Sequence, residues 1–380
     1  MEQIPLCVPS LGVDEERLLV ECVRSTFVSS VGPFVDRFER EFAAAIGSPH
    51  AVACASGTAA IHLALRALGI GPGDRVLCND CTFIASANPA IYQGASVTFI
   101  DSEERSWNLD PILVETALAD GALRGQPYKA VIAVHILGQP ADLGPILASC
   151  RRHGAVLIED AAEALGASYL DTHADPACRG RQVGTIGDIG CFSFNGNKVM
   201  TTGGGGMCTT GDPALAVRLK HLSTQAKLPG IGFTHDAIGY NYRMPNVNAA
   251  LGLAQLARLP GFLTRKRAIA ARYRSFASER GLIHHPVLPG SAGSEWLPSV
   301  LVPRRDAVMS RLNAEGIMAR PVWAPLACQP CYSGSQRIGG VVADRIGAEG
   351  LSLPCSVELS DAQQDRVLVA LAQALTEPLG

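Results

Sequence analysis

The run Asp188-Ile-Gly-Cys-Phe-Ser-Phe-Asn-Gly-Asn-Lys198, followed by Val199-Met-Thr-Thr-Gly-Gly-Gly-Gly-Met207, is the most informative stretch of the chain. Its lysine ends an apolar, β-like run and opens a glycine tract. A mobile cationic side chain beside backbone that can approach a ligand closely is typical of a lysine that forms a Schiff base. Most lysines are solvated surface residues, so this interpretation depends on the motifs elsewhere in the chain.

Short apolar runs alternate with amphipathic ones over the first 250 residues. The pattern predicts strands at 50–55, 75–78, 96–100, 129–134 and 155–160, and helices at 57–68, 84–92 and 143–153. Strands that alternate with helices indicate an α/β fold with a mainly parallel sheet and helices on both faces.

The pattern changes after about residue 258. Pro260-Gly261 is expected to break a helix that resumes at 265–277, and 286–293 is a loop rich in Pro, Gly and Ser. A strand near 296–302 and helices near 306–315 and 361–375 follow. We therefore expect a large domain over 1–258 and a smaller α+β domain over 259–380.

Composition excludes several classes of protein. The 380 residues are 47% hydrophobic and 18% charged with a net charge of −3, and no long basic tract is present, which argues against nucleic-acid binding. No apolar run approaches the roughly 20 residues that cross a bilayer, and the first residues do not resemble a signal peptide. The expected location is the cytoplasm, with no membrane partner.

Twelve scattered cysteines are expected to be reduced thiols. Cys78/Cys81 and Cys328/Cys331 have Cys-x-x-Cys spacing, which a zinc site or a redox pair also uses. Each pair ends or interrupts an apolar segment, so we favour buried structural thiols and predict no metal.

Two strand ends carry candidate ligand-binding groups. In Glu159-Asp-Ala-Ala-Glu163, the carboxylates lie at the carboxyl end of a strand, where open α/β sheets bind ligands. Asp160 suits the partner of a protonated pyridine nitrogen, or equally a helix N-cap. Ser56-Gly-Thr-Ala-Ala60 opens a helix and suits either a phosphate site, held by Thr58 and the N–H of Ala59, or a plain cap.

A third polar segment, Gly239-Tyr-Asn-Tyr-Arg243, enters an apolar helix that Asn246 is placed to cap. It contains more polar aromatic and amide side chains than an ordinary loop. A site or interface role and a structural role are about equally consistent with it. Phe83 follows another strand and suits stacking on a flat ring, although most phenylalanines belong to the core.

Together these motifs resemble the DegT/DnrJ-type sugar aminotransferases, which are pyridoxal-phosphate enzymes of the aspartate-aminotransferase fold (fold type I). The resemblance covers nearly the whole chain. Beyond the motifs above it includes Val28-Ser-Ser-Val-Gly-Pro33, Thr82-Phe-Ile-Ala-Ser-Ala-Asn88, His135-Ile-Leu-Gly-Gln-Pro-Ala-Asp142, Arg320-Pro-Val-Trp-Ala-Pro325 and Leu353-Pro-Cys-Ser356. One position departs from the commoner pattern, because Gly204 stands where many members have Glu.

The resemblance implies a role for each candidate residue. Lys198 would form the Schiff base with pyridoxal 5'-phosphate, and Asp160 would hold the ring nitrogen. The remaining cofactor-binding residues would be Gly57, Thr58, Ala59, Phe83, Glu163, Ser193 and Asn241. Asn241 would reach the phosphate of a neighbouring subunit, which implies a homodimer with shared active sites. Ser29, Ser30 and Trp323 are expected to contact substrate.

The closest branch is that of the legionaminic- and bacillosamine-type 4-aminotransferases. It implies transfer of an amino group, with L-glutamate as the expected donor, to C4 of UDP-4-keto-6-deoxy-N-acetylglucosamine in surface-glycan biosynthesis. A GDP-linked 4-keto sugar of the perosamine type and a 3-keto sugar are alternatives. Lys198 argues against the dehydrating relatives, which carry histidine there. A pyridoxal-phosphate-binding regulator without turnover is the alternative from another class.

Overall fold

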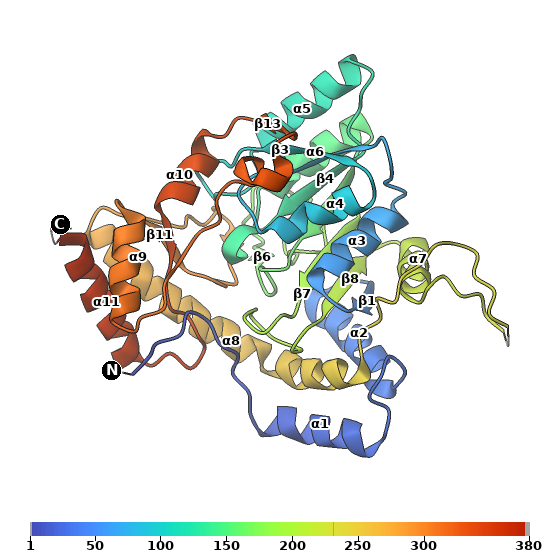
Figure 1. The fold of residues 1–380 in the computed structure, drawn as a ribbon, viewed down its shortest axis with the longest axis horizontal. Helices are drawn as coiled ribbons and strands as arrows, with labels where there is room; N and C mark the ends of the chain where they lie inside the picture. The colour runs from blue at the N-terminus through green and yellow to red at the C-terminus, as the bar shows by residue number, and fades with distance from the viewer. Residues whose placement is uncertain (1, 231, 377–380) are drawn as a thin grey trace.

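An eight-stranded mixed sheet forms the centre of the computed structural model, which describes residues 2–230 and 232–376 (Figure 1). Residues 1 and 377–380, the ends of the predicted domains, lie outside the described residues. In spatial order the strands are β1 (His50–Cys54), β8 (Gly206–Thr210), β7 (Ile189–Ser193), β5 (Val156–Asp160), β4 (Ala130–Val134), β2 (Arg75–Asn79), β3 (Ser96–Ile100) and β13 (Gln336–Ile338).

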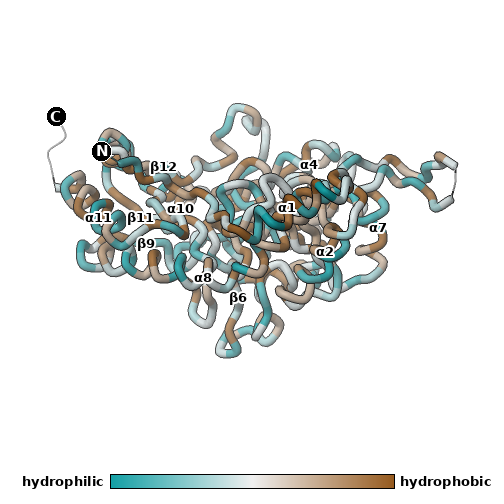
Figure 2. The backbone as a smooth tube through the Cα atoms, turned by 90° about the horizontal axis from the view of Figure 1, so that it is seen from below, coloured by the Kyte–Doolittle hydropathy of each residue, from teal (hydrophilic) through white to brown (hydrophobic). Residues whose placement is uncertain are grey.

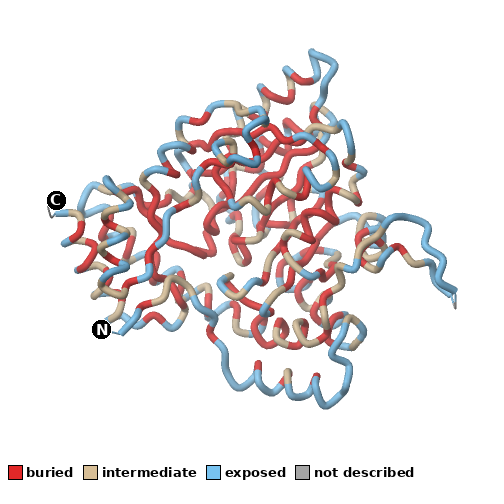
Figure 3. Tube along the Cα trace, viewed as in Figure 1, coloured by how far each residue is buried: buried red, intermediate tan, exposed pale blue. Residues whose placement is uncertain are grey.

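The sheet is mainly parallel, as the alternating pattern predicted. From β7 to β13 all neighbours are parallel, whereas β8 runs antiparallel to both β7 and β1. Every residue of β4, Ala130–Val134, is buried, as expected for a strand covered on both faces (Figure 3). The carboxyl ends of β5 and β7 therefore lie side by side at one edge of the sheet.

Helices cover both faces of this sheet, and further helices form the C-terminal part (Figure 1). They are α1 (Val13–Arg24), α2 (Pro33–Ile46), α3 (Gly57–Ala67), α4 (Asn88–Tyr92), α5 (Pro111–Leu123), α6 (Leu143–His153), α7 (Pro213–Ser223), α8 (Asn246–Glu279), α9 (Arg305–Ala314), α10 (Val341–Glu349) and α11 (Asp361–Thr376). Short 3-10 turns are η1 (Ile84–Ser86), η2 (Ile136–Gly138), η3 (Leu326–Cys328) and η4 (Pro330–Tyr332). The helix predicted over 84–92 is thus divided into η1 and α4.

A second, antiparallel sheet lies in the C-terminal part. Its order is β12 (Arg320–Pro321), β14 (Gly350–Ser352), β11 (Ser299–Leu301) and β9 (Ile283–His284). A further pair, β10 (Ser291–Ala292) with β6 (Ser168–Tyr169), is also antiparallel. The N-terminus lies beside this part, because Ile4 pairs with Ile317. We retain the division at residue 258 as a proposal.

The predicted helix break at Pro260-Gly261 is wrong. Helix α8 runs for 34 residues with Pro260 inside it, and it links the two sheets (Figure 1). Its first half packs against α1 and α2, and Ile269 and Tyr273 are fully buried in its second half. This packing offsets the cost of an interior proline, about 3 kcal/mol.

Two predicted caps also differ in the structure. Asn246 does not cap α8; its Oδ1 accepts the N–H groups of Phe34 (2.9 Å) and Val35 (3.3 Å) at the start of α2. No helix follows Asp160, so its helix-cap interpretation is wrong, although Oδ1 accepts the N–H of Ala162 (3.1 Å) in a turn. Ser56 does cap α3, because its Oγ accepts the N–H of Ala59 (3.1 Å).

The segment after α7 extends away from the rest of the molecule in two perpendicular views (Figures 1 and 2). Phe233 and Ile238 on it are 85% and 75% exposed. Asn241 lies at its base, where it pairs with Thr224. The segment thus places two large apolar side chains in solvent.

Candidate active site

A cavity of about 650 Å³ lies between the carboxyl ends of β5 and β7, the start of α3 and the antiparallel sheet. Of the predicted residues, it brings together Gly57, Thr58, Phe83, Asp160, Glu163, Ser193, Lys198 and Trp323. These residues come from distant parts of the sequence, so only the fold places them together.

Four predicted residues do not line this cavity. Ala59 is buried beneath it, with its N–H donated to Ser56. Ser29 and Ser30 precede α2, and Asn241 is exposed at the base of the projecting segment. Their roles in binding cofactor or substrate remain predictions.

Lys198 lies in the loop that joins β7 to β8. Its Nζ lies 3.7 Å from Oε1 of Glu163 and 3.7 Å from the ring centre of Trp296. Burial lowers the pKa of Lys198, against the opposing charges of Glu163 and Asp160. A lysine with a lowered pKa beside a carboxylate can serve as a nucleophile and as a proton carrier.

Glu163 is buried opposite this lysine. Its Oε2 accepts the N–H of Leu137 (2.7 Å), a residue held at a φ of 53°. Burial raises the pKa of Glu163 to about 7, and the nearby charge of Lys198 opposes this rise. Burial thus brings the pKa values of Glu163 and Lys198 closer together, which favours proton exchange between them.

Asp160 ends β5 and is fixed by a hydroxyl. Ser86 donates a hydrogen bond of 2.6 Å from Oγ to Oδ2 of Asp160, so the Thr82 hydroxyl, 2.9 Å from Ser86 Oγ, donates to Ser86. Both hydroxyls are buried. The carboxylate is thus oriented at the cavity by a chain of two hydrogen bonds.

The start of α3 and the end of β7 approach very closely. A Cβ atom on Gly57 would lie 2.7 Å from Cβ of Ser193, so no larger residue fits at this position. Thr58 and Ser193 both line the cavity beside the N-terminus of α3. Hydroxyls and a helix N-terminus form an environment that suits a phosphate.

Aromatic side chains form the opposite wall. The rings of Trp296 and Trp323 stack at 6.1 Å and 17°, and Phe83 lies 6.4 Å from Trp323. Trp296 and Ser86 are site residues that sequence reasoning missed. Ser86 lies within the quoted run 82–88, whereas the sequence around Trp296 carries no signal for a role in the site.

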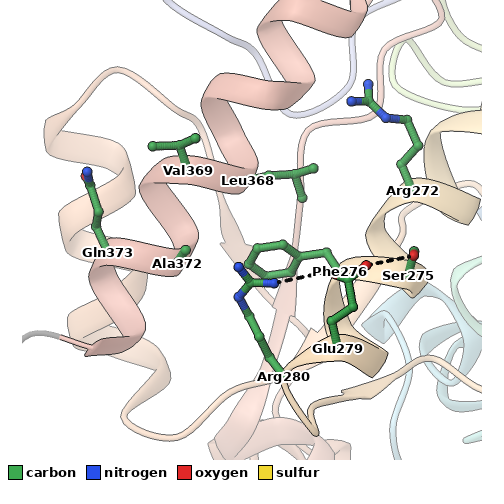
Figure 4. Close-up of a pocket in the computed structure, with 9 residues that line it drawn as sticks. All are labelled: Arg272, Ser275, Phe276, Glu279, Arg280, Leu368, Val369, Ala372 and Gln373. Atoms are coloured by element: carbon green, nitrogen blue, oxygen red, sulfur yellow. Dashed lines mark hydrogen bonds and ion pairs between the residues drawn. The ribbon is translucent and has the colours of Figure 1, made fainter.

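A second hollow, of about 480 Å³, lies between the end of α8 and α11 (Figure 4). Arg280 lies over the ring of Phe276 at 3.8 Å, and Ser275 donates to Glu279. Nothing there resembles the lysine and carboxylates of the first cavity, which we take as the candidate active site.

Within residues 2–230 and 232–376, no cluster of three or more His, Cys, Asp or Glu is arranged to hold a metal ion. All twelve cysteines are free. Cys78 and Cys81 are buried as expected, but Cys328 and Cys331 are exposed, so that expectation was wrong. The reason is that the short turns η3 and η4 carry this second pair at the surface.

None of the helices in the described part combines the length and apolarity that a membrane crossing requires.

The fold and the cavity define a pyridoxal-phosphate enzyme of fold type I. Residues 9–372 match the DegT/DnrJ/EryC1/StrS aminotransferase family, and the chain belongs to it. It is a pyridoxal-phosphate-dependent sugar aminotransferase, as the resemblance predicted.

Individual relatives match along nearly their whole length. GDP-perosamine synthase of Caulobacter vibrioides is 40% identical over 383 residues, covering 99% of each chain. GDP-perosamine synthase of Escherichia coli O157:H7 is 36% identical over 96% of each chain. The crystal structure of S. venezuelae DesV in complex with a ketimine intermediate superposes with a TM-score of 0.89 at 32% identity, covering all of both chains.

Proposed function

We propose that the chain transfers an amino group from L-glutamate to C4 of a nucleotide-linked 4-keto-6-deoxy sugar, with UDP-4-keto-6-deoxy-N-acetylglucosamine as first candidate. The observation that carries the proposal is that Lys198, Glu163 and Asp160 all line one cavity, in which the amine of Lys198 lies close to the carboxylate of Glu163. Its volume, about 650 Å³, suits a cofactor together with a sugar.

The residues of the cavity fit pyridoxal phosphate. When bound, this cofactor supplies an aldehyde that takes up the amino group and a ring that withdraws electrons. We assign Asp160 to the ring nitrogen, Thr58 and Ser193 to the phosphate, and Phe83 to the ring face. Ala59 can donate to the phosphate only if its N–H exchanges its bond with Ser56.

Proton transfer falls to Lys198. Its Nζ would take a proton from the donor's α-carbon as a base and deliver it as an acid to the C4′ carbon of the bound cofactor, and its lowered pKa favours the neutral amine that the first step needs. Glu163 lies within reach to hold that proton between the steps. The stacked rings of Trp296 and Trp323 form an apolar wall of the cavity.

The choice of sugar rests on sequence. Three stretches are similar to the legionaminic-type branch, namely Val28-Ser-Ser-Val-Gly32, Phe194-Asn-Gly-Asn-Lys198 and the run 226–229 followed by 235–242. Gly204 lines the cavity where many members have Glu, and open space surrounds its missing Cβ. A GDP-linked sugar is the second candidate, because two relatives of 40% and 36% identity are named GDP-perosamine synthases.

A half-reaction screen tests the proposal. The pyridoxamine form of the enzyme is mixed with UDP-4-keto-6-deoxy-N-acetylglucosamine, a GDP-linked 4-keto-6-deoxy sugar and a 3-keto sugar, and the return of the aldehyde-form absorbance is recorded. The UDP sugar should restore it fastest. A faster return with the GDP sugar selects the second candidate, and a return with neither 4-keto sugar contradicts the proposal.

We also propose a homodimer in which Asn241 completes the partner's phosphate site. Its exposure at the base of the projecting segment, outside its own chain's cavity, supports this arrangement. The exposed Phe233 and Ile238 on the same segment support a second copy of the chain as the covering surface.

A further inference from the structure

Lys266 is an ammonium group buried beside the active site. It lies in α8 with 1% of its surface exposed, and its Nζ donates to the carbonyl oxygens of Trp296 and Cys355, both at 3.0 Å. Among the described residues, no carboxylate forms an ion pair with it. A buried ammonium without a counter-charge costs several kcal/mol, so an anion beside Nζ would stabilise the charged form of Lys266.

Two sulfur atoms are the only groups in contact that can supply this negative charge within the described chain. Sγ of Cys355 lies 3.6 Å from Nζ of Lys266, and Sγ of Cys7 lies 3.8 Å from it. Burial alone would lower the pKa of Lys266, but the charges of Cys355 and Cys7 outweigh this effect and raise it. A thiolate at either sulfur would therefore stabilise the charged form of Lys266.

Cys7 is the better candidate for the thiolate. A hydrogen bond from Cys355, together with the charges of Lys266 and Lys198, outweighs burial and lowers the pKa of Cys7 to about 6. Burial instead raises the pKa of Cys355. Cys7 is also half-buried whereas Cys355 is fully buried, so reagents from solution reach Cys7 first.

The side chains of Cys7 and Cys355 are neighbours. Their sulfurs contact the same Nζ and interact with each other, and the N–H of Cys355 donates to the carbonyl of Leu6 at 2.7 Å. The backbone beside Cys7 and that of Cys355 therefore lie next to each other.

The same cluster supports the wall of the active site. The carbonyl of Trp296 accepts from Lys266 and lies 3.1 Å from Sγ of Cys355, which can donate to it when Cys7 does not take that proton, and the indole N–H of Trp296 donates to the carbonyl of Asn197 at 2.6 Å. When protonated, Cys7 donates to that carbonyl as well, at 3.3 Å. Lys198 follows Asn197 and lies over the Trp296 ring.

We propose that Cys7 and Cys355 form a peroxide-sensitive thiol pair, and that its oxidation to a disulfide reversibly inactivates the enzyme. The Cys7 thiolate attacks one oxygen of the peroxide, the O–O bond breaks, and the released hydroxide takes up a proton to form water. The sulfur of Cys355 then attacks the Cys7 sulfenic acid, its proton leaves, and the S–O bond breaks to release a second water. Two thiols are oxidised while one peroxide is reduced to two waters.

Oxidation removes the counter-charge of Lys266. The ammonium must then lose its proton or move toward water, and either change disturbs the carbonyls of Trp296 and Cys355 that it holds. Because Trp296 contacts Lys198, the disturbance reaches the reacting lysine. This inference depends on the cluster alone and not on which sugar is the substrate.

Pulsed alkylation tests the thiolate. The holoenzyme is treated briefly with iodoacetamide between pH 5 and 9, and labelled peptides are quantified by mass spectrometry. Labelling of Cys7 should reach half its maximum near pH 6, as its lowered pKa requires. The exposed Cys328 and Cys331 are internal references in the same sample.

Lys266→Met should move the midpoint of Cys7 labelling to higher pH. If that variant does not fold, the midpoint measured for the wild type still tests whether Cys7 is a thiolate. A Cys7 midpoint at the ordinary thiol value of about 8.5 would overturn the proposal.

Peroxide treatment tests the disulfide. Stoichiometric hydrogen peroxide should yield a peptide that links Cys7 to Cys355, lower the melting temperature and abolish activity, and a dithiol should reverse all three. Cys7→Ser should stay active and lose activity at least about tenfold more slowly, because the attacking thiolate is gone. A linkage of Cys328 to Cys331 alone, or equal inactivation of Cys7→Ser, would overturn the proposal.

Discussion

Nζ of Lys198 lies 3.7 Å from Oε1 of Glu163, and burial brings the pKa values of the two groups closer together. The pKa of Lys198 is lowered and that of Glu163 is raised to about 7. The charge of Glu163 limits the fall of the lysine pKa, because it favours the ammonium.

Replacing Glu163 by Gln should therefore make Lys198 a neutral amine at lower pH. An opposite charge at this distance shifts a pKa by about 1 to 3 units. Only the neutral amine attacks the cofactor aldehyde. The cofactor-free variant should thus bind pyridoxal phosphate covalently at lower pH than the wild type, as read from the visible absorbance.

Two controls accompany this titration. Glu163→Asp retains the charge and should move the midpoint less than Glu163→Gln does. Lys198→Ala should give no covalent absorbance, and borohydride should fix the cofactor of the wild type on the peptide that contains Lys198. A midpoint that is the same in Glu163→Gln and the wild type would contradict the electrostatic role.

Asp160 should affect the rate of reaction more than the binding of cofactor. Asp160→Asn cannot hold a protonated ring nitrogen, so kcat should fall by about 100-fold or more while the fold and most cofactor binding remain. Ser86→Ala removes the hydrogen bond that orients the carboxylate, worth about 1.5 kcal/mol, together with the bond from Thr82, and should lower kcat about tenfold.

Steady-state kinetics and cofactor titration of both variants check that Asp160→Asn lowers kcat more than Ser86→Ala does, while cofactor binding is largely kept. Thr82→Val, which removes the hydroxyl behind Ser86, is the matched control and should have a smaller effect than Ser86→Ala. A near-normal kcat in Asp160→Asn would show that Asp160 has only a structural role, as the acceptor of the Ala162 N–H in the turn.

The neighbouring carboxylate, Glu159, is structural. It is fully buried and accepts from His135 (3.1 Å) and from the N–H groups of Gly184 (2.7 Å), Ile186 (2.6 Å) and Gly187 (2.6 Å). Burial raises its pKa, but the bonds from His135 and the backbone outweigh burial, so the pKa is lowered. Alternation along β5 turns Glu159 and Asp160 to opposite faces of the sheet.

Glu159→Gln should lower the free energy of unfolding by about 3 kcal/mol at pH 7, because an amide N–H would face backbone donors. Since the folded-state pKa is lowered, the carboxylate stabilises the protein above the unfolded value of about 4.3, and this contribution is lost as pH falls through the folded pKa. Urea unfolding at pH 7 and pH 4 measures both effects.

The exposed Glu279→Gln is the control for charge removal and should change stability by less than about 0.5 kcal/mol. If the Glu159→Gln variant were as stable as the wild type at pH 7, the negative charge of Glu159 would not be needed by His135 and the three backbone N–H groups that donate to it.

Local patterns predicted much of the central sheet but not its strands β8 and β13. Each strand of the first 160 residues that the sequence predicted is present, because buried strands read as continuous apolar runs. Lys198 and Asp160 were found because they end such runs. The continuity of α8 across Pro260 was not predictable, since only packing on both sides holds it.

Tertiary contacts explain the other misses. Trp296 reaches Lys198 from the small antiparallel part of the chain, and no local pattern indicates this contact. Asn246 sits at the start of α8, as predicted, yet its side chain caps α2 because the two helices pack together. Sequence reasoning proposed which residues carry chemistry but not which elements support them.

The shared active site gives the last prediction. If Asn241 completes the partner's phosphate site, neither Lys198→Ala nor Asn241→Asp alone should be active, but a mixture should be. A mixed dimer has one site with both wild-type residues and one with both lesions. After random exchange half of the dimers are mixed, so activity should reach at most about a quarter of the wild-type value.

The measurement requires proof of exchange, which a pull-down of differently tagged subunits provides. Asn241→Asp tests the position sharply, because a carboxylate repels the phosphate that the amide would hold. Thr224→Ala, which alters the residue paired with Asn241 and leaves the amide intact, is the matched control and should retain activity alone. If subunits exchange and the mixture stays inactive, Asn241 acts within its own chain or not at all, and the segment beyond α7 contributes no residue to a neighbouring site.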